Sequence, residues 1–441
     1  MVGNTMATLH KLAYGVGMAF SASCFIAMGM LVGHAGAWSP LALCASFLLM
    51  LVIIAAVSEL SALFPSAVGL RTYIRAGLGD SAALAAVLLY LVLVLLVGGL
   101  EVRVLAAVLE PLWPGLNTLV MTAALFGLIL STQVLGWRAS TAVQTSLVVL
   151  LLGAVALLVA VAWQQPPSAS PALTLPADDF ASATVIGLFL FASVEWITTL
   201  QVRHPADARR MPRLLLLSCV LLMLLFLGTT QAIVHLMQAG ATVDLSVPQL
   251  ALAAGLPPPW SLWLLLLVTG LALLSTCNAG LACAARLVYL LAREGHLPRA
   301  LTATNAAGAP VAALGAVALA CLAAAAVVVH LPSADGVAEA CALAICTVYA
   351  LYLVSAARLR AGPRRPAWPT LLLPRALLWA VAGLLLAVMV ATCWEAQQRG
   401  HVGLALLPWC AAALGLAAMR WRAARRPSPA LPRAPLHPTQ Q

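Results

Sequence analysis

Residues 185–213 read VIGLFLFASVEWITTLQVRHPADARRMPR and change character halfway along. The first half is apolar enough to lie in a bilayer, yet it carries Ala192, Ser193 and Glu195 in its middle. A carboxylate at that depth is costly unless it faces a cavity or a partner, so Glu195 is a candidate functional residue. The second half is a basic loop. A polar break in an apolar helix beside such a loop is typical of a binding site at the middle of a membrane.

The composition is that of an integral membrane protein. Of the 441 residues, 63% are hydrophobic and 8% are charged, and the mean hydropathy is +1.04. Apolar stretches of about 20 residues recur along the chain, and each is long enough to cross a hydrocarbon core of about 30 Å. We expect helices, because an open sheet edge does not occur in lipid. The predicted spans cover residues 12–34, 40–64, 82–104, 117–136, 140–163, 183–202, 213–237, 259–284, 309–330, 336–357, 374–396 and 402–420.

The basic residues predict how these spans are oriented. The sequence has 23 Lys and Arg. With the N-terminus inside, all of them except Arg103 and Arg399 fall on the cytoplasmic side, which is where basic loops accumulate. We therefore expect both termini in the cytoplasm, with residues 1–11 as the N-terminal segment and residues 421–441 as a basic, Pro-rich tail. The net charge of +10 thus reflects membrane orientation and does not indicate nucleic acid.

The bias in amino-acid usage favours a bacterial source. Arg outnumbers Lys by far, since Lys11 is the one lysine, and alanine is abundant. This usage is typical of GC-rich bacterial genomes. The expected location is therefore the bacterial inner membrane, with the lipid bilayer as a partner.

The first predicted span contains a run of small and polar residues. It reads YGVGMAFSASCFIAMGMLVG over 14–33. Such a run fits a face where membrane helices pack closely. It also fits a discontinuous helix whose free N–H groups meet an anionic ligand group. FSASCF at 20–25 and LFASVE at 190–195 share an Ala-Ser pair, as an inverted repeat of two five-helix blocks would produce.

Other polar residues of the predicted spans have simpler interpretations. Glu59 lies near a cytoplasmic end, where we expect it to snorkel to the membrane surface or to pair with a loop arginine, and not to contact the substrate. Glu101 is expected at the rim of the outer mouth. It cannot face Arg103 along one helix face, because the two are two residues apart. Ser275 and Asn278 belong to a polar patch in the eighth span.

Four local patterns resemble those of the amino acid–polyamine–organocation (APC) permeases. SELSALFPSAVGLRTY at 58–73 resembles the family's Glu-Leu…Pro-x-x-Gly-Gly-x-Tyr-x-Tyr, and GWRASTAVQT at 136–145 resembles the start of family helix five. FLFASVEW at 189–196, followed by MPR at 211–213, resembles helix six and its loop. ARLVYLLAREGHLP at 285–298 resembles Arg-x-x-Tyr-x-x-Ala-Arg-Asp-Gly-x-Leu-Pro and is the most specific of the four.

This resemblance implies an all-α polytopic membrane protein with about twelve transmembrane helices, arranged as a 5+5 inverted repeat (LeuT-type) plus two peripheral helices. The first repeat is expected over residues 12–163, the second over 183–357 and the peripheral helices over 374–420. Discontinuous helices one and six would frame the substrate site. We expect small-molecule substrate binding, and no catalytic, metal or cofactor site.

The resemblance also assigns site residues. The family's Gly-Ser-Gly-Ile-Phe falls on residues 21–25, its gating aromatic on Phe189, its helix-six glycine on Ser193 and its acidic residue on Glu195. Both helix-one glycines are serines here, and no lysine lies at the helix-five position near Leu150. The substrate's carboxylate contact and the coupling ion therefore stay open. The predicted substrate-binding residues are Ser21, Ala22, Ser23, Cys24, Phe25, Phe189, Ala192, Ser193, Glu195, Ser275 and Asn278.

The sequence thus favours a secondary transporter of an amino acid or a related amine, working by alternating access with a coupled proton or an exchanged solute. Import, export and exchange are all compatible with it. A membrane enzyme is not favoured, because the sequence has no HExxH or Asp-rich motif at the membrane surface. The alternative is a transport-inactive substrate sensor or scaffold with the same fold.

Overall fold

The computed structural model describes residues 2–64, 69–110, 113–165, 179–199, 209–238, 243–245, 248–331, 334–363, 366–368 and 370–424. Residues 65–68 of the SELSALFPSAVGLRTY pattern, the basic loop over 200–208 and the chain from residue 425 onward lie outside these residues. Helix α16 continues to Ala424, four residues into the range predicted as a tail.

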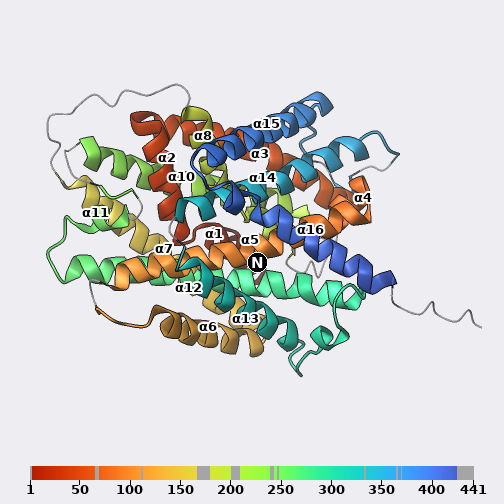
Figure 1. The fold of residues 1–441 in the computed structure, drawn as a ribbon, viewed down its shortest axis with the longest axis horizontal. Coiled ribbons are helices and arrows are strands. Elements are labelled where there is room, and N and C mark those ends of the chain that lie inside the picture. The colour runs from red at the N-terminus through yellow and green to blue at the C-terminus, as the bar shows by residue number, and fades with distance from the viewer. Residues whose placement is uncertain are drawn as a thin grey trace, which may run out of the picture.

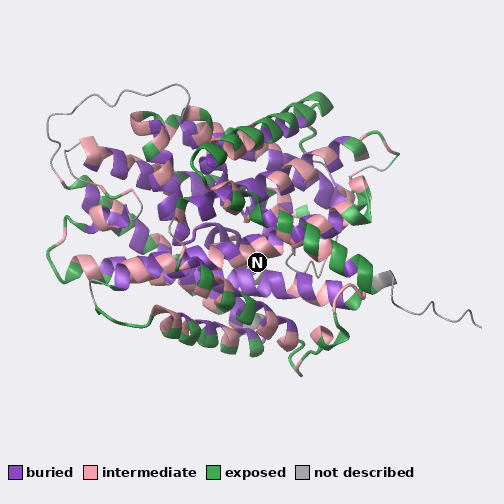
Figure 2. Ribbon diagram, in the orientation of Figure 1, coloured by how far each residue is buried: buried purple, intermediate pink, exposed green. Residues whose placement is uncertain are grey.

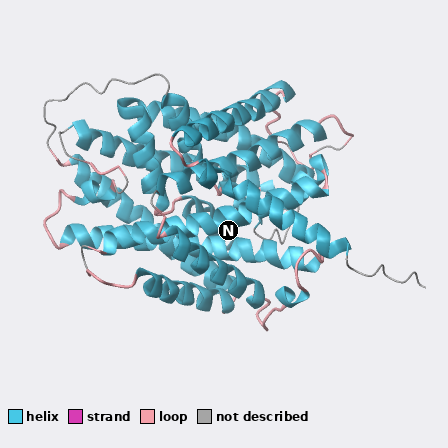
Figure 3. Cartoon of the chain, in the orientation of Figure 1, coloured by secondary structure: helices cyan, strands magenta, loops and turns pink. Residues whose placement is uncertain are grey.

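The described residues form helices and connecting loops, with no strand among them (Figure 3). The α-helices of the first half are α1 (Val2–Ala19), α2 (Ser23–Ala35), α3 (Ser39–Leu63), α4 (Gly69–Leu78), α5 (Asp80–Leu109), α6 (Thr118–Val134) and α7 (Trp137–Trp163). Those of the second half are α8 (Asp179–Leu190), α10 (Met211–Gln238), α11 (Gln249–Ala253), α12 (Trp260–Arg293), α13 (Val311–Val328), α14 (Ala334–Leu359), α15 (Arg375–Gln398) and α16 (Val402–Ala424). Short 3₁₀ helices are η1 (Gly36–Trp38), η2 (Val194–Thr199) and η3 (Arg299–Thr302).

Every predicted span contains helix in the structure. Within the described residues, ten helical runs are long and apolar enough to cross a membrane. One of these runs, Ser23–Leu63, contains both α2 and α3, with η1 between them. Helix α6 is apolar but has 17 residues, fewer than the others. Counting α2 and α3 separately and including α6 gives the twelve predicted spans, with α1 and α2 as the two halves of the first.

Two of the spans are broken, and they lie side by side in opposite directions. The first is interrupted between Ala19 and Ser23, and the sixth is interrupted between Leu190 and Val194. Helix α2 packs against α8, while α1 packs against η2 (Figure 1). The first half of each broken helix therefore contacts the second half of the other, as an inverted repeat requires.

The other helix contacts follow the same two-fold relation. The second helices of the two blocks, α3 and α10, pack on each other. The third helix of the first block, α5, packs on α14, the fifth helix of the second block. The reciprocal pair, α12 and α7, is also in contact. The fold is a 5+5 inverted repeat of the LeuT type.

Burial separates the repeats from the last two helices. In the most apolar windows of α12 and α14, 78% of the residues are buried inside the protein, against 28% for α15 and 22% for α16. Figure 2 shows α15 mostly exposed along the upper edge of the bundle, and α16 with exposed segments where it runs from the middle of the view to the lower right. An apolar helix with so little protein cover presents its surface to lipid, so α15 and α16 are the two peripheral helices.

Ion pairs join the two repeats at one end of the bundle. Glu59 at the end of α3 binds the guanidinium of Arg360, which follows α14, so the pairing predicted for Glu59 is confirmed. Arg71 on α4 is 3% exposed and donates to Glu294, just after α12, at 2.6 Å and to Asp80 at 2.8 Å. These contacts connect elements from both halves of the chain.

Candidate functional site

The break in helix one is held by a carboxylate from a neighbouring helix. The backbone N–H groups of Ala22 and Ser23 donate to the two carboxylate oxygens of Glu101, each at 2.8 Å. The first N–H groups of a helix have no partner within it, so an acidic side chain is a favourable acceptor for the start of α2. Glu101 thereby joins α5 to the discontinuity of helix one.

The predicted position of Glu101 at an outer rim is wrong. Its side chain is buried, with 1% of its surface exposed. Arg103 points elsewhere and donates to the carbonyl of Leu331 at 2.5 Å. The partners of Glu101 are about eighty residues earlier in the chain, and sequence spacing along α5 alone does not reveal them.

The side chains at the same break hydrogen-bond to one another. The hydroxyls of Ser21 and Ser23 are 2.8 Å apart, and the Cys24 thiol donates to the carbonyl of Ala19 at 3.1 Å. These contacts replace part of the helical ladder between α1 and α2. The two serines at family glycine positions thus contribute hydroxyls to the break.

The break in helix six depends on an unusual backbone conformation. Ser193 has φ of +77°, in the left-handed region that glycine adopts without strain. Just before it, the helix tightens, because the N–H of Ala192 donates to the carbonyl of Phe189 at 2.9 Å. The family's glycine falls on Ser193, and the positive φ gives a physical reason for a glycine there.

Glu195 follows this break and binds a tyrosine of another helix. The hydroxyl of Tyr349, on α14, donates to Oε2 of Glu195 at 3.0 Å. Oε1 is buried and has no hydrogen-bond partner among the described residues. Glu195 is 1% exposed, so this oxygen is shielded from bulk water.

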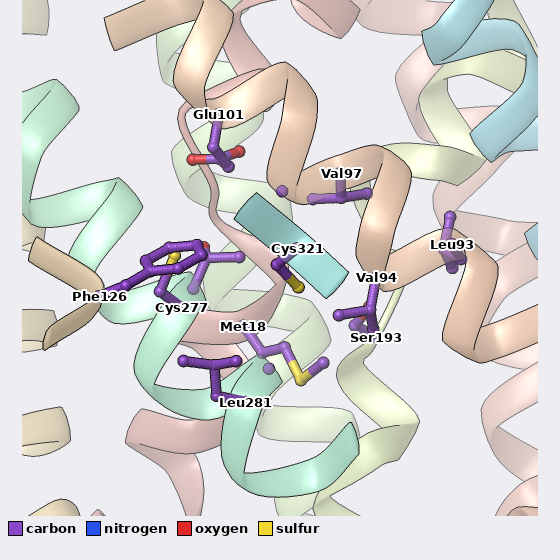
Figure 4. Close-up of a pocket in the computed structure, with 13 residues that line it drawn as sticks. Met18, Leu93, Val94, Val97, Glu101, Phe126, Ser193, Cys277, Leu281 and Cys321 are labelled. Carbon is purple, nitrogen blue, oxygen red and sulfur yellow. The ribbon is translucent and has the colours of Figure 1, made fainter. Parts of the chain in front are cut away.

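A cavity lies between the two breaks (Figure 4). Its empty space is about 490 Å³, part of which is open to solvent. The walls come from α1, α5, α6, α12 and α13, together with Ser193 at the helix-six break. Among the lining residues, all in the described part, Glu101 is the one acidic side chain and none is basic. Most of the remaining wall is apolar, including Leu93, Val97 and Phe126.

The predicted site residues occupy different places relative to this cavity. Ser193 lines it, and Ala22 and Ser23 bind the carboxylate that lines it. The other predicted residues are not among the described residues that line the cavity. Ser21, Cys24, Phe25, Phe189, Ala192 and Glu195 are buried around the two breaks.

Ser275 and Asn278 form a hydrogen-bond network between helices. Ser275 donates to the carbonyl of Gly17 at 3.0 Å and accepts from Gln144 at 3.0 Å. The amide of Asn278 donates to the side chain of Gln144 at 2.8 Å and accepts from Gln133 at 2.7 Å. These contacts hold α12 to α1, α6 and α7. Thr276 and Cys277, between them in the sequence, are the residues that line the cavity.

Aromatic rings connect the two broken helices through α10. Phe20 lies edge-on to Phe25 with ring centroids 6.0 Å apart and stacks on Phe226 of α10 at 5.4 Å. Phe226 in turn meets Phe191, at the helix-six break, edge-on at 5.7 Å. Sequence reasoning selected Phe25 and Phe189 and missed the other three. For Phe20 and Phe191 the available signal was an aromatic residue next to a break, whereas Phe226 lies in the middle of α10 and had no such signal.

The arrangement can bind a small molecule but offers no catalytic group pair. The cavity combines apolar walls with few polar groups, the usual composition of a small-molecule site. No cluster of His, Cys, Asp or Glu able to hold a metal ion occurs among the described residues.

Two broken antiparallel helices with a cavity between them define a membrane transporter. A sequence model of the amino acid permease family matches residues 10–399. The chain therefore belongs to the amino acid permease family, within the superfamily that its motifs resemble, and it is not an enzyme. A search of curated proteins found no match.

The fold is also found in a solved transporter structure. The crystal structure of the Eremococcus coleocola manganese transporter, in complex with an aromatic bis-isothiourea substituted compound, has a TM-score of 0.58 to this chain. The alignment covers 94% of this chain and 95% of that one at 13% identity. At this identity the similarity concerns the fold alone.

Proposed function

We propose that this permease is a secondary transporter of an amino acid or a related amine, working by alternating access across a bacterial inner membrane. The observation that carries the proposal is the cavity that Ser193 and Glu101 line together, since these residues belong to or contact the two helix breaks. Rocking one repeat against the other around such a site exposes it to each side in turn.

We assign ligand contact and coupling to different residues. Ser193 and Glu101 face the cavity and would meet the ligand. Glu195 lies beyond the break, beside Tyr349, and retains one buried oxygen without a partner in the described chain. It is our candidate for the group that carries a coupled proton. The buried aromatic residues around Phe189 and Phe25 would cover the ligand.

The proposed topology places both termini in the cytoplasm. The distribution of basic residues supports it. The first repeat would then span residues 12–163 and the second 183–357, with the peripheral pair over 374–420.

Uptake by proteoliposomes tests this function. The purified protein would be reconstituted and assayed with radiolabelled amino acids, and by efflux-driven exchange with unlabelled amino acids and amines inside. We expect saturable accumulation of at least one compound class that protein-free vesicles do not show. Ligand binding without any accumulation or exchange would identify a sensor or scaffold and refute the transport function.

A further inference from the structure

The helix-one break has no backbone donor left for a ligand. Over residues 21–25, every backbone N–H has an acceptor. Those of Ala22 and Ser23 donate to Glu101, and the others donate to oxygen or sulfur atoms of the same segment. A carboxylate of the protein therefore occupies the position at which these N–H groups would receive an anionic ligand group.

A ligand carboxylate does not fit beside this arrangement. It would have to displace Glu101 from two hydrogen bonds of 2.8 Å. It would also stand next to a like-charged group, in a cavity whose lining has no basic side chain to compensate. The site thus discriminates against anions.

A cationic ligand group fits the same place. An ionised carboxylate offers about four lone-pair positions. The two backbone N–H groups use two of them, and the hydroxyls of Ser21 and Ser23 also bond to this carboxylate. An ammonium group could replace these neutral hydroxyls as the donor and supply the positive charge that the cavity wall lacks. The surrounding side chains, including Val97, Phe126 and Leu281, then favour an apolar body on the same ligand.

We infer that Glu101 sets the substrate class of this permease, which is an apolar amine without a free carboxylate. The ammonium group pairs with Glu101, and the hydrocarbon part fills the cavity between α5, α6 and α12. This inference rests on the proposed function, because it concerns the ligand of the same site.

Binding of matched ligand pairs to the purified wild-type protein tests the inference. Isothermal titration calorimetry would compare leucine with 3-methylbutylamine and with leucinamide, and phenylalanine with 2-phenylethylamine. Each pair differs in the presence or charge of the carboxylate. We expect the amines and the amide to bind at least about tenfold more tightly than the amino acids, as burial of an uncompensated charge predicts.

Equal or tighter binding of leucine or phenylalanine overturns the inference. If the proteoliposomes also accumulate those amino acids, the proposed function stands while the inference fails. If no member of any pair binds and no compound is accumulated or exchanged, the proposed function fails and the inference fails with it.

The variant Glu101→Gln links the preference to this residue. Its amide keeps the size of the side chain but removes the charge, so the preference for amine over amino acid should fall by at least about tenfold. The ratio of two Kd values in one sample does not depend on the folded fraction. Glu110→Gln, at the exposed residue that directly follows α5, is the matched control and should keep the wild-type ratio. An unchanged ratio in Glu101→Gln overturns the inference. The wild-type comparison needs no variant, so it stands even where Glu101→Gln yields no folded protein.

Discussion

The hydroxyl of Tyr349 donates a hydrogen bond to Glu195 at 3.0 Å and so connects α14, the last helix of the second repeat, to the broken first helix of that repeat. The other carboxylate oxygen is buried with no hydrogen-bond partner in the described chain. A carboxylate that held the broken helix together would accept from the N–H groups freed by the break. Glu101 does this at helix one, whereas the side-chain partner of Glu195 is the Tyr349 hydroxyl of another helix, and this supports a different role for Glu195.

We expect Glu195→Gln to flatten the pH dependence of transport while leaving the melting temperature of the ligand-free protein nearly unchanged. The amide can still accept from Tyr349 but cannot exchange a proton. Uptake by proteoliposomes would be measured at several pH values between about 5 and 8, where a buried carboxylate can gain or lose its proton. The slope of uptake against pH reports the first effect. Thermal unfolding would measure the second.

Tyr349→Phe is the matched control for this prediction. It removes the hydroxyl that donates to Oε2, so that neither carboxylate oxygen of Glu195 has a side-chain partner in the described chain. We therefore expect a lower melting temperature. Parallel pH profiles for wild type and Glu195→Gln, or a loss of several degrees in that variant alone, would show that the carboxylate is structural.

The positive φ of Ser193 predicts an opposite effect of two substitutions on stability. An L-residue in this conformation costs about 1 kcal/mol, which glycine avoids. Ser193→Gly should therefore leave the melting temperature unchanged or raise it. Ser193→Val should lower it by several degrees, because a β-branched side chain is the least tolerant of this region. Thermal unfolding of both variants in detergent checks the order, and a more stable valine variant would contradict the assigned conformation.

Arg71 and Arg75 offer a matched pair on one short helix. Arg71 is 3% exposed and bridges Glu294 and Asp80, whereas Arg75 is 60% exposed and contacts Asp80 at 3.2 Å. We expect Arg71→Met to cost about 1–2 kcal/mol of stability, because it removes the buried guanidinium that Glu294 and Asp80 share. Arg75→Met should cost less than about 0.5 kcal/mol, as for an exposed ion pair. Equal melting temperatures for the two variants would refute this difference.

Cysteine labelling tests the proposed orientation. Ala306 follows α12 and Leu116 precedes α6, and both are exposed. With an impermeant maleimide, Leu116→Cys should react in intact cells, and Ala306→Cys should react only after permeabilisation. The reverse pattern would invert the topology.

Hydropathy predicted the spans because each helix must cover about 30 Å of hydrocarbon. The apolar run that this requires can be recognised in each segment without knowing its neighbours. The breaks in helices one and six were also predictable, because small and polar residues such as Ser23 and Ser193 stand out in apolar segments. The pairing of Glu59 followed from its place near an end rich in arginine.

The contacts of the site could not be predicted in this way. Glu101 was expected at a rim, and this was wrong. Its partners are determined by how α5 packs on helix one, and the spacing of residues within α5 does not show that packing. Gly98 and Gly99, just before it, mark a helix that neighbours approach closely, and they were the available signal. The hydrogen bonds of Asn278 to Gln144 and Gln133 were likewise not predictable, because a buried amide takes its partners from helices far away in the sequence.

The most direct test of the central claim is uptake by two leucine variants of α12. Gly280 lines the cavity, and a Cβ there would find its nearest neighbour, the end of Met18, at 4.0 Å. Gly270 lies on the same helix but is not among the residues that line the cavity. A Cβ added there would have no atom of the described chain within 4 Å. If the transported molecule occupies the cavity between the two breaks, proteoliposomes with Gly280→Leu should lose uptake, while those with Gly270→Leu keep it at equal protein content and similar melting temperature. Wild-type uptake by a folded Gly280→Leu protein would contradict the claim.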